Sequence, residues 1–159
     1  MLKEILSVSG KPGLFKLISQ GKNMFVVESL IDHKRIPVYT RETKVVPLGE
    51  ISIYTNNEDL PLGKVLRQIK EKENGQAIDF NPKTVTSEEL KSWFATVLPE
   101  FDRQRVHPSH IKKIMSWYNL LLSENLTDFA GDEEVQEVKE NEEVKEEAKN
   151  ENNSSENNS

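Results

Sequence analysis

Short runs of apolar residues, each closed by turn-forming residues, fill the first part of the chain. β-Branched and aromatic residues dominate these runs, and glycine, asparagine, aspartate and charged residues separate them, which predicts short β-strands. Close turns between short strands favour an antiparallel sheet curled into a small barrel. The five predicted strands are Leu14–Ile18, Met24–Leu30, Ile36–Tyr39, Lys44–Val46 and Ile51–Tyr54.

After residue 58 the apolar residues recur at helical spacing. Leu62, Val65, Leu66 and Ile69 follow the i, i+3, i+4, i+7 pattern of an amphipathic helix, which Asn74–Gly75 should end. A second helix is predicted after a capping box of Thr86 and Glu89 and stops before Pro99, and a third starts from a cap on Ser109. Their expected buried residues are Leu90, Trp93, Phe94 and Val97, then Ile111, Ile114, Met115, Tyr118, Leu121 and Leu122.

The end of the chain differs sharply in charge from the rest. Residues 132–159 hold 11 of the 27 acidic residues and 3 of the 21 basic ones, so this segment carries −8 and residues 1–131 carry +2. It has no aromatic residue and few apolar ones, so it cannot bury enough surface to offset the chain entropy. We therefore expect a disordered acidic tail, either an interaction arm or a solubilising segment.

These patterns together predict an α+β protein in three parts. Residues 1–57 are expected to form a five-stranded antiparallel barrel of the Src-homology-3 or Tudor type, preceded by a short helix containing Leu2, Ile5 and Leu6. Residues 58–126 should form a three-helix unit, and residues 127–159 the disordered acidic tail. The alternative is an open α+β domain in which the helices cover one face of the sheet.

Motifs with a defined chemistry are weak in this sequence. The chain has no cysteine, which excludes disulfides, thiolate metal sites and cysteine nucleophiles. Gly10–Gly13 precedes a predicted strand and Gly21-Lys22 is followed by Asn23, so neither segment matches a phosphate-binding loop, and both read as turns. His107 and His110 lack an evident third metal ligand. We expect no catalytic residue, no cofactor, no metal and no enzymatic activity.

The chain shows no targeting or membrane segment in its pattern. Glu4 lies within the first apolar residues, and no stretch approaches the ~20 apolar residues of a membrane helix. We therefore expect a cytoplasmic protein that does not associate with membranes.

Three segments resemble a bacterial family defined by a domain of unknown function and found mainly in the Bacteroidetes. They are "MLKEILSVSGKPGLFKLISQGKNMFVVESL", "PLGEISIYT" and "LPEFDRQRVHPSHIKKIMSWYNLL". The similarity covers roughly residues 1–125 and ends before the acidic tail. It implies a bacterial cytoplasmic protein but no activity, because no catalytic or binding residue is known to transfer.

The absence of a catalytic constellation favours a non-enzymatic adaptor that binds a protein or peptide; the alternative is an RNA- or DNA-associated accessory protein that uses basic barrel loops. An apolar groove between barrel and helices would favour the adaptor, and an exposed aromatic beside Lys11, Lys22 and Arg35 would favour nucleic acid. A deep polar pocket around His107, His110 and Asp102 would favour an enzyme. The candidate contact residues are Lys11, Lys22, Lys34, Arg35, Arg41 and Tyr39.

Overall fold

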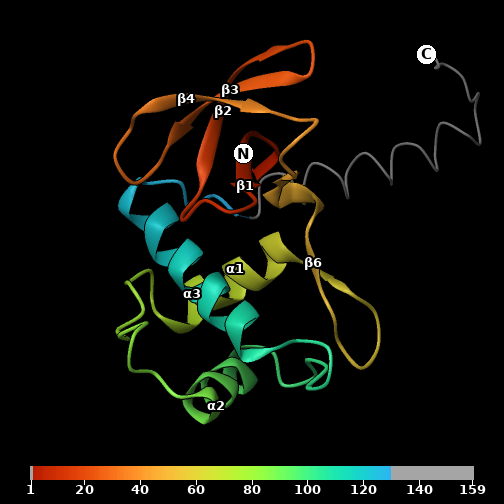
Figure 1. Ribbon diagram of the computed structural model, residues 1–159. Helices are drawn as coiled ribbons and strands as arrows, with labels where there is room; N and C mark the ends of the chain where they lie inside the picture. Colours follow the sequence, from red (N-terminus) through yellow and green to blue (C-terminus); the bar gives the residue numbers. More distant parts are fainter. Residues whose placement is uncertain (1, 130–159) are drawn as a thin grey trace, which may run out of the picture.

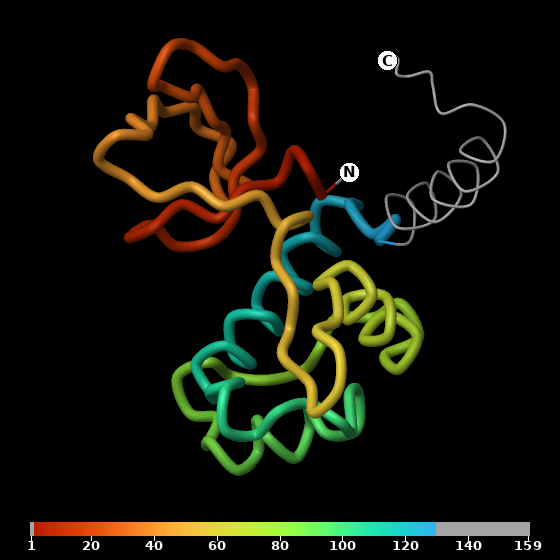
Figure 2. The backbone as a smooth tube through the Cα atoms, turned by 90° about the vertical axis from the view of Figure 1, so that its right-hand side faces the viewer, coloured from red at the N-terminus to blue at the C-terminus, as the bar shows by residue number. Residues whose placement is uncertain are grey.

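The computed structural model describes residues 2–129. A curled β-sheet lies at one end of the molecule and three α-helices lie at the other, and the last helix runs from the helical end toward the sheet (Figure 1). The same arrangement is visible after a turn of 90° (Figure 2).

The sheet has five antiparallel strands in the order β4-β3-β2-β1-β5. The first four strands pair in chain order, and β5 then returns to pair with β1, with Leu6 opposite Pro47. An irregularity between Leu17 and Ser19 shifts the register of β2 against β3, and such bulges increase the bend of a strand. The strands are β1 (Ile5–Val8), β2 (Phe15–Gly21), β3 (Met24–Ser29), β4 (Arg35–Tyr39) and β5 (Val45–Pro47).

Three sequence expectations about this sheet are wrong. Its fifth strand is β1, in the segment expected to be a short helix, of which only the 3-10 turn η1 (Leu2–Glu4) is present. The expected last strand lies outside the sheet, because η2 (Leu48–Glu50) redirects the chain and β6 (Ser52–Ile53) then pairs only with β7 (Leu60–Pro61). The sheet is also not a closed barrel, since β4 and β5 are its two edges.

One face of the curled sheet encloses a small apolar core of its own. All five strands contribute to it, so the alternation of side chains along each strand turns one set inward. Pro37 lies in the edge strand β4, where its missing N–H removes no ladder bond from the sheet interior. The core residues are Leu6, Val8, Phe15, Val27 and Val38, with Leu17, Phe25, Ile36 and Val45 packed against them.

The three helices follow the predicted apolar stripes. Helix α1 (Leu62–Lys72) has Gly63 in its first turn and ends at Asn74 and Gly75, which both adopt positive φ. Helix α2 (Ser87–Val97) starts at the predicted capping box, in which the Glu89 N–H donates to Thr86 Oγ1. Helix α3 (Pro108–Ser123) completes the set.

Two details of the helical part differ from the sequence expectations. Helix α3 begins two residues earlier than predicted, with His107 as its N-cap and Pro108 in the first helical position, so Ser109 is not the cap. At the other end, Phe129 is buried beside Tyr118, and Lys70 donates to the carbonyl of Thr127. These first residues of the predicted tail are therefore folded, and the remainder of the predicted tail, 130–159, lies outside the described residues.

The larger apolar core joins the sheet to the helices. Leu2, Ile5, Leu14, Leu30 and Leu48 come from the N-terminal part, and they belong to the same buried cluster as the inner faces of all three helices. The sheet meets the helices through Ile5 of β1 and through residues that flank its strands, such as Leu14 and Leu30.

Candidate functional site

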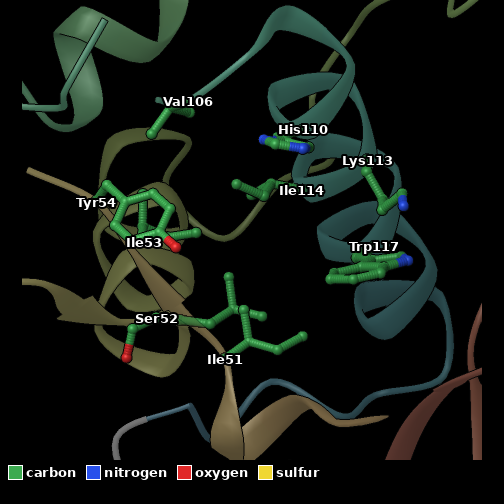
Figure 3. Close-up of a pocket in the computed structure, with 10 residues that line it drawn as sticks. Ile51, Ser52, Ile53, Tyr54, Val106, His110, Lys113, Ile114 and Trp117 are labelled. Atoms are coloured by element: carbon green, nitrogen blue, oxygen red, sulfur yellow. The ribbon is translucent and has the colours of Figure 1, made fainter. Parts of the chain in front are cut away.

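An apolar pocket lies between β6 and α3. Figure 3 shows Ile51, Ile53 and Tyr54 on the β6 side and His110, Ile114 and Trp117 projecting toward them from the helix. The pocket has a volume of about 240 Å³. The three α3 residues stand at i, i+4 and i+7 and so share one face of the helix. Leu62 and Val106 complete the apolar lining.

The rim of this pocket is built from aromatic and basic side chains. Tyr54 is 42% exposed, and the guanidinium of Arg105 lies over its ring at 4.1 Å from the centroid. Arg105 is held there by Asp102, whose Oδ2 accepts a hydrogen bond from Arg105 Nε at 2.9 Å. On the helix, the Lys113 ammonium lies 5.9 Å from the centre of the Trp117 ring. On the Tyr54 side of the rim, the hydrogen bond from Arg105 to Asp102 therefore holds the guanidinium over the tyrosine ring.

His110 is the titratable group that lines the pocket beside Lys113. Burial, the neighbouring His107 and the positive charge of Lys113 all lower the pKa of His110. Its Nδ1 accepts a hydrogen bond from the His107 backbone N–H at 3.3 Å, so this nitrogen caps the helix instead of facing a substrate. A ring that is neutral at neutral pH and occupied in this way suits an apolar wall better than proton transfer.

The enzyme hypothesis would require His107, His110 and Asp102 to line one polar pocket. Only His110 lines the apolar pocket, while Asp102 is paired with Arg105. Within residues 2–129, no three histidine or acidic side chains gather in a way that could hold a metal ion. The expectations that the protein has no enzymatic activity and no cofactor therefore stay predictions.

The structure places the six predicted contact residues at opposite ends of the sheet. Thr40 donates to the Asn23 carbonyl, which brings the turn holding Lys22 next to the one holding Tyr39 and Arg41. At the other end, Lys11 and Lys34 line a shallow cavity beside Ile31. Arg35 is there too and forms an ion pair with Glu28 at 3.0 Å. The exposed Tyr39 thus lies away from Lys11 and Arg35.

Sequence reasoning missed the residues of the pocket. The apolar residues of the third helix are expected to be buried in the core. On one edge of this helix, however, Ile114 and Trp117 line the cavity. The basic residues Lys112 and Lys113 lie inside the third helix, outside the predicted loops that hold the candidate lysines. Their spacing from Ser109 and Ser116 marks a polar helix face, which is the signal that could have found them.

Comparisons with known proteins place this fold in a bacterial family. The model of DUF5606, a domain of unknown function, matches residues 2–48, and that of DUF6852, also a domain of unknown function, matches residues 51–121. A solution NMR structure from Bacteroides vulgatus, a structural genomics target, is 51% identical. The alignment covers 81% of this chain and 91% of that one, with a TM-score of 0.68. No curated protein matches.

The chain therefore belongs to a bacterial family of unknown function that includes the Bacteroides vulgatus protein, and it carries both DUF5606 and DUF6852. This confirms the resemblance found from the sequence segments. The two matched segments adjoin within η2, where the chain leaves the sheet. In the part of the chain that the structure describes, no helix has both the length and the apolar character needed to cross a bilayer.

Proposed function

We propose that this protein is a non-enzymatic binding protein of the bacterial cytoplasm, and that the pocket between β6 and α3 receives one apolar side chain of a partner protein or peptide. The observation that carries the proposal is the concave apolar surface rimmed by Tyr54 and Trp117. Aromatic residues around a desolvated pocket are typical of the energetic centre of protein interfaces.

The size of the pocket supports a side-chain anchor over a metabolite. Its volume of about 240 Å³ is below the ~300–1,000 Å³ of pockets that enclose small-molecule ligands. One large aliphatic or aromatic side chain fits such a space, with the rest of the partner lying across the rim. The positive charge of Lys113 at the rim favours a partner with acidic character near its anchor.

The sheet supports a binding role without defining one. Five short antiparallel strands with a bulge, curled around a small core, are consistent with an opened variant of the Src-homology-3 or Tudor type, and we include that assignment in the proposal. The nucleic-acid alternative is less favoured, because Lys22 and Arg41 lie at the opposite end of the sheet from Lys11 and Lys34. A continuous phosphate-binding track would need them on one surface.

Selection from a random peptide library displayed on phage, against the immobilised full chain, tests the proposal. Selected peptides should share an aliphatic or aromatic residue, and the affinity of a synthetic peptide is then measured by fluorescence anisotropy. Tyr54→Ala should weaken binding by about tenfold or more, as expected for a residue at the centre of an interface. Oligonucleotides at two salt concentrations serve as the comparison ligand.

Tyr39→Ala is the matched control, because Tyr39 is 52% exposed but lies at the far end of the sheet. It should leave the affinity unchanged within about twofold. Failure to select any peptide, or equal affinity of the wild-type and Tyr54→Ala proteins, would contradict the proposed function. Circular dichroism of each variant confirms that it is folded.

A further inference from the structure

A second cavity opens beside the apolar pocket, on the other side of Lys113. Its walls are residues 7–13, which form the end of β1 and the loop that leads to β2, and the neighbouring face of α3. Its volume is about 410 Å³. Lys113 and Trp117 line both this cavity and the apolar pocket. The two spaces are therefore adjacent subsites of one surface, separated by two side chains of a single helix.

The charge of this second cavity is entirely positive. Lys11 from the loop and Lys112 and Lys113 from the helix line it, and no acidic residue among residues 2–129 does. Some basic side chains elsewhere are paired with an acidic residue, for example Arg35 with Glu28 and Arg105 with Asp102. None of the carboxylates within residues 2–129 forms an ion pair with the three lysines of the cavity. Three uncompensated ammonium groups around one concave space favour an anion.

Hydroxyl groups add further hydrogen-bond donors to the same cavity. Ser7 and Ser9 come from the loop side, and Ser109 and Ser116 from the helix side. The helical residues Ser109, Lys112, Lys113 and Ser116 stand at i, i+3, i+4 and i+7, so one face of α3 presents both hydroxyl and ammonium groups. Every one of these side chains can donate a hydrogen bond to an oxyanion.

The loop wall has a defined shape. The Lys11 N–H donates to the Val8 carbonyl at 3.1 Å, and the Ser9 N–H donates to the Lys44 carbonyl at 2.9 Å, which fixes the start of the loop on the sheet. Gly10 has a φ of +82° and no neighbouring atom within 4 Å of where a Cβ would stand. The loop therefore presents bare backbone and a lysine to the cavity, although its sequence fits no phosphate-loop motif.

Phosphate fits this donor set better than a carboxylate does. A phosphorylated side chain carries about −1.5 to −2 charges at neutral pH and three acceptor oxygens, whereas a carboxylate carries one charge and two oxygens. The cavity of about 410 Å³ also leaves room for the side chain that carries the phosphate. Because Lys113 and Trp117 border both spaces, a single peptide reaches both.

We propose that the cavity between the Ser7–Gly13 loop and α3 is an oxyanion site that binds a phosphorylated side chain of the peptide whose apolar residue occupies the adjacent pocket. The peptide part of this assignment rests on the proposed function, whereas the oxyanion site itself does not. The phosphorylated residue and the apolar anchor then lie on opposite sides of Trp117 in the bound peptide.

The oxyanion site is tested by titrating the ¹⁵N-labelled full chain with inorganic phosphate, at ionic strength held constant with sodium chloride, and recording amide shifts. Phosphate should produce saturable shifts confined to residues 7–13 and 109–117, and sodium acetate at the same ionic strength should produce weaker ones. Lys112→Gln/Lys113→Gln should weaken phosphate binding by about tenfold or more, because it removes two of the three charges. Lys83→Gln/Lys91→Gln, with the same charge change at exposed positions outside the cavity, should leave it unchanged within about twofold.

Shifts that do not saturate, or that are equal in Lys112→Gln/Lys113→Gln and in wild type, would overturn the oxyanion site, while peptide binding in the apolar pocket would be untouched. The second arm uses a peptide selected on the apolar pocket, with serine or phosphoserine at each position beside its anchor. At least one phosphoserine version should bind about tenfold more tightly than its serine counterpart. Equal affinities at all positions, or tighter binding of an oligonucleotide at the same amides, would overturn the phosphopeptide assignment.

Discussion

The two apolar cores of this protein differ in how far along the chain they draw their residues. The sheet core joins side chains between Leu6 and Val45, all within the curled sheet. The larger core joins Leu2 to Phe129 and includes residues from the sheet side and from every helix. Folding of the larger core thus requires both halves of the chain at once, while the sheet core depends on strands that are close in sequence.

The candidate binding surface lies where these two parts of the molecule meet. The apolar pocket is formed by the segment that leaves the sheet and by α3, and the cationic cavity by a sheet loop and the same helix. The cationic cavity takes its walls from both halves of the chain, whereas every residue that lines the apolar pocket lies between Ile51 and Trp117. The larger core therefore also positions the residues of the candidate binding surface, since Ile114 and Trp117 belong to that core and line the apolar pocket.

The largest expected effect is a difference in stability between truncations in the two cores. Phe94→Ala, in the larger core, should lower the free energy of unfolding by about 3–5 kcal/mol. Val27→Ala, in the sheet core, should lower it by about 2 kcal/mol, because it removes two methyl groups at ~0.8 kcal/mol each and leaves a small cavity. Urea unfolding followed by tryptophan fluorescence and circular dichroism measures both. A larger loss for Val27→Ala would reverse the ranking of the cores.

An intermediate effect is expected where the loop meets α3. Gly13 has a φ of +78°, and a Cβ added there would lie 2.5 Å from Ile31 Cδ1. Gly13→Ala should cost about 1–2 kcal/mol for the left-handed backbone, plus ~0.5–1.5 kcal/mol for moving Ile31, whose exposed side chain can rotate away. Thermal unfolding measures the change.

Gly10→Ala is its control, because Gly10 has the same backbone conformation but open space around it. Gly10→Ala should lose only the stability that the left-handed backbone costs. In the double variant Gly13→Ala/Ile31→Ala, the additional cost of moving Ile31 should disappear. If Gly13→Ala lowered the stability no more than Gly10→Ala does, the close approach of Ile31 to this loop would not contribute to the stability change.

The smallest effect is a pH dependence at the contact between the β3–β4 turn and α3. His33 Nε2 and Glu124 Oε1 lie 2.8 Å apart, and the hydrogen bond and charge of Glu124 raise the pKa of His33. A raised folded-state pKa means that the contribution to stability is fully present below the ordinary pKa of about 6.5 and is lost as the pH rises through the folded value.

Stability measured between pH 5 and 8 in wild type and Glu124→Gln should therefore differ most below pH 6.5 and converge above it. Because both groups are solvent-accessible, high salt should reduce the difference. A difference that persisted unchanged at pH 8 would show that Glu124 acts through something other than protonated His33.

Local patterns in the sequence determined the helices and, except at the start of α3, the ends predicted for them. The capping box of Thr86 with Glu89, the stop at Asn74–Gly75 and the spacing of Leu62, Val65, Leu66 and Ile69 each depend on residues within a few positions. The turns at Gly10 and Gly13 were likewise predictable, because positive φ is a local demand that glycine meets. Membership of the bacterial family also followed from the sequence segments alone.

Only the tertiary structure decided which short strands pair and what the helix faces border. Ile5–Val8 and Ile51–Tyr54 carry similar apolar patterns, yet the first joins the sheet because β5 returns beside it, and the second pairs with β7 after η2 turns the chain. Lys11 and Lys113 are 102 positions apart in the numbering and line one cavity. No pattern within a few residues encodes such pairings, because they depend on long-range packing between the sheet and α3.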